Sequence, residues 1–368
     1  MRRTRSTLTL GTALAVAIAA AAPSAGAQGL SSASARLAPQ YVSYQLTQGG
    51  SKSTVSELAV PFAFAIPLTS RLTFDVATAY ASAMVDGGGA KSTISGFTDT
   101  QVRFNLTFGA DALVVTAGLN APSGQYEVKE DKIAAAGNIG NDFFAFPVSS
   151  FGNGLAGTGG IALARAIGEW NLGLGASFRK SAEFGAYQTS SDVLHFTPAD
   201  EMRLRAGVDH SLGDGRVMLG VVFSQFGKDA TDDGTSQTTY STGDRIIGQA
   251  AVELPVGERQ LYVGGWYLHH AAGEQVTGEA PPENIMNVLA ALSMNAGSVF
   301  LEPSVEARFW QIDGARAGLL TYAGLRTKFQ LSSFELSPSF AYGFGSTEGA
   351  AKTDVSGIKG GLTIKLVR

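Results

Sequence analysis

Apolar residues alternate with small or polar residues along most of this chain. In 58–68 one phase reads Leu, Val, Phe, Phe, Ile, Leu, and the other phase holds only Ala and Pro. A period of two is typical of β-strands, because successive side chains of a strand point to opposite faces. The pattern predicts strands with one strongly apolar face, and it recurs in 102–108, 172–179, 202–209, 334–344 and 362–366.

A soluble β-sandwich would show similar alternation, but three further features favour a transmembrane barrel. The second phase is rich in Gly, Ala and Ser, which suits a crowded lumen better than a solvated face. The alternating segments are long compared with the usual strand of about five or six residues. Short and long connections also alternate along the chain, as in outer-membrane barrels, whose short turns are periplasmic.

The spacing of the connections predicts the number of strands. Short turns are expected near 69–70, 109–111, 168–169, 213–215, 256–258, 296–298 and 332–333. Long loops are expected near 47–54, 84–95, 122–154, 185–199, 227–241, 272–284 and 346–356, with a shorter one near 311–316. The fold class is therefore all-β: a transmembrane antiparallel up-and-down β-barrel of about 16 strands, with about 14 as the alternative, because bacterial barrels have even strand numbers. The strands should begin near Gln40, Val55, Arg71, Thr93, Asp111, Leu155, Trp170, Ala199, Arg216, Tyr240, Arg259, Glu283, Val299, Ala315, Phe334 and Val355.

Three prolines, Pro61, Pro303 and Pro338, fall inside predicted strands. Proline has no N–H to donate to a ladder, and a closed barrel has no free edge. We expect bulges or strand ends at these positions.

Composition supports this interpretation and excludes other classes. Charged residues make up only 16% of the chain, against about 25% in soluble domains. The net charge of -4 comes with scattered Lys and Arg, so no basic face predicts nucleic-acid binding. The chain has no Cys, which excludes disulfides and thiolate metal sites.

The first residues resemble a secretion signal. Arg2, Arg3 and Arg5 precede an uncharged run over 8–22, and Ala25-Gly26-Ala27 offers a small-x-small cleavage site. We expect 1–27 to be a signal peptide and 28–368 to form the barrel, exported through the inner membrane to the bacterial outer membrane. The alternative is an uncleaved anchor, for which the apolar run is short.

One stretch resembles a known family. Residues 96–101 read Gly-Phe-Thr-Asp-Thr-Gln, Phe108-Gly109 follows, and 118–124 read Gly-Leu-Asn-Ala-Pro-Ser-Gly. The stretch resembles a hairpin of FadL-like and phenol-degradation-associated outer-membrane transporters, in which a Gly-Leu-x-x-Pro-Thr-Gly segment ends the second strand. Ser123 stands where Thr is commoner. The resemblance covers 96–124 and implies a monomeric barrel that passes small, often hydrophobic, compounds.

The polar phase of the strands carries charges that cannot face lipid, where an Arg or Lys at the midplane costs about 2–4 kcal/mol. They either form structural ion pairs or line a polar track for solutes, and because both signs are mixed we expect no strong ion selectivity. The candidate lumen-lining residues are Arg103, Arg179, Arg203, Arg205, Asp209, Glu302, Glu306, Arg308, Arg326 and Lys328.

The longest predicted loop, at about 125–154, contains an apolar run that would not be stable in water alone. Phe143, Phe144 and Phe146 form this run, after a charged patch and an Ala-rich segment that suits a short helix. We expect the loop to fold into the barrel mouth as a lid or gate. The alternative is contact with lipopolysaccharide or a partner.

No constellation predicts catalysis. Asp209, His210 and Ser211 are adjacent, but neighbours on a strand point to opposite faces and cannot converge as a triad. The pair His269-His270 cannot bind one metal from a single face for the same reason. We therefore assign no catalytic residue, cofactor or metal site and expect no enzymatic activity.

The sequence thus favours passive, porin-like transport of small molecules, hydrophobic ones included, across the outer membrane. The alternative is a non-conducting structural or binding barrel that displays its surface loops. The expected partners are outer-membrane lipid, lipopolysaccharide and an unidentified solute, but no nucleic acid, and we expect a monomer rather than an oligomer.

Overall fold

The computed structural model describes residues 33–109, 112–125, 127–188, 192–275, 278–297, 299–331, 333–349 and 351–366. The expected signal peptide, 1–27, lies outside these residues. The strands of the wall are β1 (Ser34–Leu37), β2 (Gln40–Gln48), β3 (Ser51–Pro67), β4 (Leu72–Gly87), β5 (Ala90–Phe97), β6 (Thr100–Phe108), β7 (Leu113–Ala121), β9 (Ala156–Ile167), β10 (Trp170–Ser181), β13 (Glu201–Leu212), β14 (Gly215–Phe226), β17 (Arg245–Val256), β18 (Arg259–His270), β21 (Glu283–Ala296), β22 (Val299–Ile312), β23 (Ala315–Leu331), β24 (Phe334–Glu348) and β25 (Lys352–Leu366).

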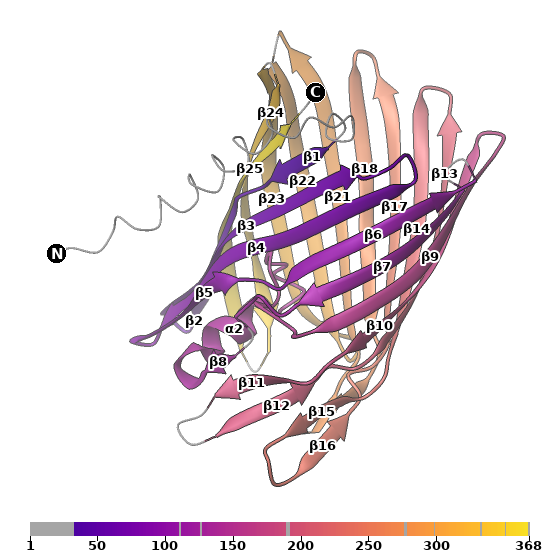
Figure 1. The fold of residues 1–368 in the computed structure, drawn as a ribbon. Helices are drawn as coiled ribbons and strands as arrows, with labels where there is room; N and C mark the ends of the chain where they lie inside the picture. The colour runs from indigo at the N-terminus through magenta and orange to yellow at the C-terminus, as the bar shows by residue number, and fades with distance from the viewer. Residues whose placement is uncertain are drawn as a thin grey trace.

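These strands form one closed antiparallel barrel (Figure 1). β1 and β2 both pair with β3 and β25, and β5 and β6 both pair with β4. Each of these two couples fills a single place in the wall, so the barrel has 16 strand positions. The predicted class and strand number are confirmed. β25 closes the ring against the first strands, and the first and last described strands meet at the short-turn end.

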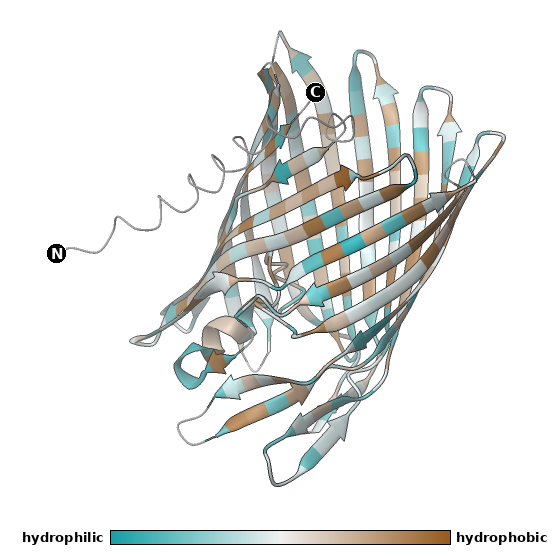
Figure 2. Cartoon of the chain, in the orientation of Figure 1, coloured by the Kyte–Doolittle hydropathy of each residue, from teal (hydrophilic) through white to brown (hydrophobic). Residues whose placement is uncertain are grey.

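The outer face of the wall is apolar. Leu174, Phe340 and Phe344 expose 59%, 56% and 57% of their surface although they lie in the middle or outer parts of long strands. Alternating brown and pale or teal bands along the strands show the period of two (Figure 2). A continuous exposed apolar belt of this kind is stable against acyl chains and not in water.

Three of the predicted long loops are wrong. Gly49–Gly50 joins β2 to β3 and Gly88–Gly89 joins β4 to β5, with φ values of 56° to 86° that favour glycine. β24 and β25 are likewise separated only by 349–351. The polar composition near 47–54, 84–95 and 346–356 marks strand ends that project beyond the apolar belt, because water-exposed ladders need no apolar face. The long connections that remain are 122–155, 182–200, 227–244 and 271–282.

The three prolines lie where strand pairing is broken on one side. The ladder to β21 is interrupted beside Pro303, and the ladder between β23 and β24 is interrupted beside Pro338. Pro61 lies opposite the break between β1 and β2. The missing N–H therefore costs no ladder hydrogen bond at these places.

A second, smaller sheet lies beyond the long-loop end (Figure 1). It contains β8 (Val128–Lys129), β11 (Phe184–Gln188), β12 (Val193–Thr197), β15 (Asp229–Asp232) and β16 (Gln237–Tyr240), while β19 (Gly273–Gln275) and β20 (Gly278–Ala280) form a separate hairpin. The connection 122–155 also holds the 3-10 helix η2 (Glu130–Lys132) and the helix α2 (Ile133–Ile139). Among the described residues, no helix is long and apolar enough to cross a membrane.

Candidate pore and its inserted loop

The connection between β7 and β9, residues 122–155, folds into the barrel, and we call it the inserted loop. Its helix α2 contacts β3, β4 and β5. Ala135 and Ile139 of α2 are 0% and 1% exposed. They join one buried cluster with inward-facing side chains of these strands, which we call the apolar wall: Val55, Ala59, Ala79, Ala81, Ala83 and Ile94.

The aromatic run of the inserted loop is packed inside the barrel. Phe143 is fully buried and stacks on Trp310, with ring centroids 4.9 Å apart. Phe146 is 7% exposed, and Phe144 is partly buried. A Cβ on Gly318 would lie 2.8 Å from the Phe143 ring, so the absence of a side chain there makes room for it. All three phenylalanines predicted in the loop therefore lie in the lumen.

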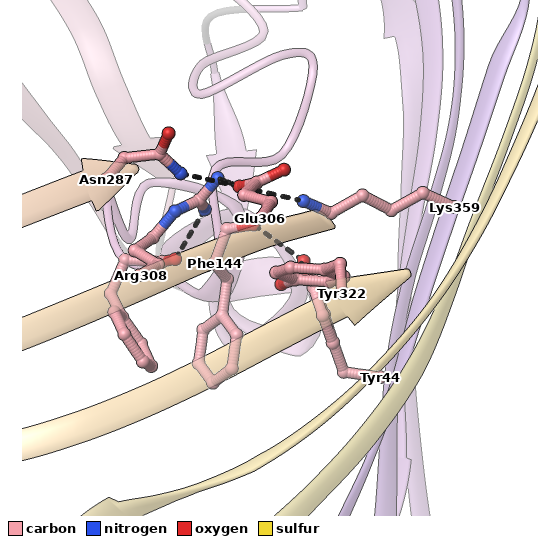
Figure 3. A network of polar contacts seen from close by, with 8 residues as sticks. Tyr44, Phe144, Asn287, Glu306, Arg308, Tyr322 and Lys359 are labelled. Carbon is pink, nitrogen blue, oxygen red and sulfur yellow. Dashed lines mark hydrogen bonds and ion pairs between the residues drawn. The ribbon is translucent and has the colours of Figure 1, made fainter. Parts of the chain in front are cut away.

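Two backbone carbonyls of this run are held by side chains of the wall, in a group that we call the anchor network (Figure 3). The Tyr44 hydroxyl donates to the Phe144 carbonyl at 2.8 Å and lies 2.9 Å from the Tyr322 hydroxyl. Arg308 donates to the Phe143 carbonyl at 2.7 Å. Buried carbonyls need such partners, because leaving one unsatisfied costs about 1–3 kcal/mol.

Glu306 completes the anchor network from the side. Its carboxylate accepts hydrogen bonds at 2.6 Å from Arg308 and from Asn287. The Lys359 ammonium lies 3.9 Å from the same carboxylate and 3.7 Å from the centroid of the Tyr322 ring. Glu306 thus gives Arg308, which is 5% exposed, an ion-pair partner in a buried place.

The base of the inserted loop is tied by one carboxylate. Asp99 accepts the N–H of Gly124 at 3.0 Å and the N–H of Asn153 at 2.7 Å, so it holds both ends of the loop. Ser123 lies beside it, with its hydroxyl accepting the N–H of Thr100 at 2.9 Å. Asp99, Ser123 and Gly124 belong to the stretch 96–124 that resembles a transporter hairpin. In this structure that stretch ties the base of the inserted loop.

A second carboxylate holds the returning arm of the loop. Glu57 is fully buried, and it accepts the N–H of Val148 at 2.9 Å. Val148 is itself 7% exposed and belongs to the buried cluster of the apolar wall. The loop is thus fixed at its base, at its returning arm and at its aromatic run.

The opposite side of the lumen is open. A cavity of about 570 Å³ lies between the inserted loop and the strands β6 to β13. Its lining includes four inward-facing arginines, which we call the arginine wall: Arg103, Arg179, Arg203 and Arg205. A second cavity of about 480 Å³ lies toward the short-turn end and is also lined by Arg103, together with Arg326 and Lys328.

The remaining predicted lumen residues also face inward, mostly in ion pairs. Glu302 pairs with Arg326 at 2.8 Å, and Lys328 lies 3.8 Å from Glu335. Asp209 pairs with Arg216 and accepts a hydrogen bond from Asn171 at 2.9 Å. The structure therefore brings the predicted residues together in two groups: the anchor network holds Glu306 and Arg308, and the others line or flank the cavities.

The residues that superficially suggest catalysis stay apart. His210 faces outward and stacks on Trp170, with centroids 4.1 Å apart, while Asp209 faces the lumen. His269 contacts Asn284 at 2.8 Å on the outer face. Within the described ranges, no group of three or more His, Cys, Asp or Glu side chains could hold a metal ion.

No protein-family model matches the sequence, and no curated protein matches it. Several solved barrels are similar in structure. A TodX monoaromatic hydrocarbon channel mutant is 10% identical over 93% of this chain and 91% of its own, with a TM-score of 0.45. A loop-deletion mutant of OmpT, an outer membrane protein of Vibrio cholerae, is 10% identical over 90% and 99%, with a TM-score of 0.43. An anion-selective porin from Comamonas acidovorans is 13% identical over 91% and 99%, with a TM-score of 0.42. The fold assignment rests on the strand pairing of the chain itself.

Of the residues that hold the loop, the sequence predicted Arg308 to face the lumen but did not predict Tyr44, Tyr322 or Asp99. Tyr44 and Tyr322 lie in the inward phase of their strands, but they are uncharged, and the prediction of lumen residues rests on charge. Asp99 lies in the stretch 96–124, whose resemblance to transporters assigns it no role. The available signal was the position of Asp99 directly before a strand and its Gly-Pro-Ser-rich partner segment, which together suggest a loop tie.

Proposed function

We propose that this chain is a passive channel of the bacterial outer membrane, narrowed on one side by the inserted loop. The observation that carries the proposal is the pair of cavities, of about 570 and 480 Å³, that share Arg103 in their lining. Together they extend along the lumen from the inserted loop toward the short-turn end. Since short turns are periplasmic in such barrels, the loop lies in the extracellular half.

In this proposal the inserted loop acts as the gate, with Phe143, Phe144 and Phe146 as its packed part. Its three attachments to the wall hold it against one side, so solutes pass along the other. Charged side chains line both cavities, which favours hydrophilic solutes. The hydrophobic solutes implied by the resemblance, a monomeric state and contact with lipopolysaccharide stay predictions. No described group suggests an enzymatic role.

Deleting residues 128–147 tests the proposal. The deletion removes η2, α2 and the aromatic run but leaves Asp99, Gly124 and Val148 in place, so the barrel wall is unchanged. We expect single-channel conductance in planar bilayers to rise several-fold above that of the intact protein.

A matched control removes residues 230–239 instead. This segment covers most of the hairpin β15–β16 in the outer sheet and contributes nothing to the two cavities, so conductance should stay unchanged. A barrel that conducts neither with nor without 128–147 would instead support the non-conducting structural role.

A further inference from the structure

The two lumen cavities differ from the rest of the lumen in how their charges are paired. Around them, Glu201 pairs with Arg203 at 2.6 Å, and Asp99 is occupied by the inserted loop. Glu302 and Glu335 pair with Arg326 and Lys328. Asp75, which lines the second cavity opposite Arg103 in the ladder, accepts a hydrogen bond from the Asn105 side chain, and the basic side chains of this cavity outnumber its carboxylates. Among the described residues, no carboxylate forms an ion pair with five basic side chains of these cavities: Arg36, Arg103, Arg179, Arg205 and Lys365.

These basic side chains line the two cavities, which meet at Arg103. Arg103 lines both cavities; Arg179 and Arg205 line the first, and Arg36 and Lys365 line the second. We call these five residues the basic track. It leads from the inserted loop toward the short-turn end, with Arg103, Arg179 and Arg205 on the open side and Arg36 and Lys365 on β1 and β25.

The wall between the arginines is made of small residues, which leaves their guanidinium groups free to reach the lumen. In the register, Gly118 and Thr158 stand between Arg103 and Arg179 in one row across the strands. A Cβ at Gly118 would lie 3.2 Å from Cγ of Arg103, so a glycine leaves this stem its space. Arg205 lies beside Gly175 in the next strand.

We propose that the basic track selects small solutes that carry an oxyanion group, carboxylate or phosphate, for passage through the lumen. Guanidinium groups present a planar fork of donors that matches such groups, and they remain charged at every relevant pH. Charges of one sign in a low-dielectric cleft also raise the local concentration of the opposite ion. Because most carboxylates around the cavities already have partners, the inference predicts selectivity for anions, whereas the mixed signs in the sequence predict no strong ion selectivity. The inference rests on the proposed channel function and names its substrate class.

The test compares purified wild-type protein with the triple variant Arg103→Gln/Arg179→Gln/Arg205→Gln. In a KCl gradient across a planar bilayer, the wild type should prefer chloride, and the triple variant should lose about two- to five-fold in the chloride-to-potassium permeability ratio. In liposome swelling, succinate should pass faster than succinamide, which has the same skeleton without the charges, and the triple variant should remove this difference. Replacing succinate with inorganic phosphate shows whether the track distinguishes the two oxyanions.

Two controls separate charge from folding. Arg165→Gln makes the same substitution on β9, opposite the outward-facing Leu172, and it should leave selectivity unchanged. Changing Arg103, Arg179 and Arg205 to Lys should keep the chloride preference. Heat-modifiable gel migration confirms that every variant has folded.

A wild-type chloride-to-potassium ratio at or below one, or a ratio that the triple variant leaves unchanged, overturns the inference while the channel function stands. If the wild type conducts nothing, the channel function fails, and binding decides the inference: succinate should raise the melting temperature of the detergent-folded wild type and not of the triple variant. Equal responses of the two proteins would then overturn it.

Discussion

The two sides of the lumen differ in the side chains that face inward, although both belong to the same barrel. On β3, β4 and β5 the inward positions are mostly Ala, with Ile and Val, and the inserted loop covers them so closely that Ala81 and Ala83 are fully buried. On β6, β10 and β13 the inward positions hold Arg between Gly, Ser and Thr, and a cavity of about 570 Å³ remains in front of them. The loop packs on small apolar inward residues, and buried polar groups such as Glu57 and Arg308 bond its backbone, whereas the arginines without an ion-pair partner line the open cavity.

The difference follows from the cost of desolvation. An Ala-lined surface gains stability when apolar loop residues cover it, by roughly 25 cal/mol per Å² of apolar surface removed from water. Burying an arginine that has no partner costs several kcal/mol of desolvation free energy. The loop therefore covers the mostly apolar side, where the buried Glu57 carboxylate accepts the N–H of Val148, and the arginine-lined side stays open.

The largest effect should come from placing a charge under the loop. Ala81→Arg would bury an unpaired cation beneath α2, and this cost of several kcal/mol should release the loop in most molecules. Conductance should then approach that of the barrel lacking 128–147, and the loop should become sensitive to protease added to intact cells.

The matched control for this change is Ala77→Arg. Ala77 lies on the same face of β4 but lines the second cavity, where an arginine remains hydrated, so the loop should stay protected. Equal protease sensitivity of the two variants would mean that the apolar wall does not hold the loop.

A smaller effect should come from filling the open side. Ser177 lines the first cavity next to Arg203 in the register, and Ser177→Trp would place an indole in the path. We expect conductance to fall by about half, because an aromatic ring of this size occupies a sizeable part of the cavity. Planar-bilayer recordings measure this, and Ala176→Trp, on the outward face of the same strand, should have no such effect.

The smallest effect should come from removing one hydroxyl of the anchor network. Tyr44→Phe keeps the ring contacts with Phe144 and Phe146 but leaves the Phe144 carbonyl without its donor, which should cost about 1 kcal/mol. Flickering between two conductance levels should become more frequent while the mean conductance of each level is unchanged. A loss of folding in this variant would show that the hydroxyl supports the barrel and not the loop.

Much of the fold could be predicted because each strand carries its own signal. The period of two needs only local sequence, and turn residues such as Gly168-Glu169 mark the ends. The hairpins at Gly49–Gly50 and Gly88–Gly89 were misjudged because polar composition does not distinguish a loop from a strand in water. The insertion of the loop could also be predicted from local sequence, because three phenylalanines in a loop are unfavourable in water.

The attachments of the loop could not be predicted in the same way. Tyr44 and Tyr322 are 278 positions apart, and they meet only because the ring closes between β25 and β2. Charge pairing depends on side-chain conformation as well as on register: Glu201 pairs with Arg203 on its own strand, while Arg179, opposite Glu201 in the ladder, has no ion-pair partner within the described ranges. Composition counts both signs alike, and only the positions of the side chains show which arginines remain unpaired.

The closure of the ring sets an order on assembly. The anchor network takes Tyr44 from one of the earliest strands and Arg308, Tyr322 and Lys359 from the last ones, so it cannot exist until the two ends of the chain have met. A half-built barrel would hold a loose loop and a wide opening, and the phenylalanines can settle only at the final step. The aromatic run of the loop can therefore reach its packed position only after the barrel has closed.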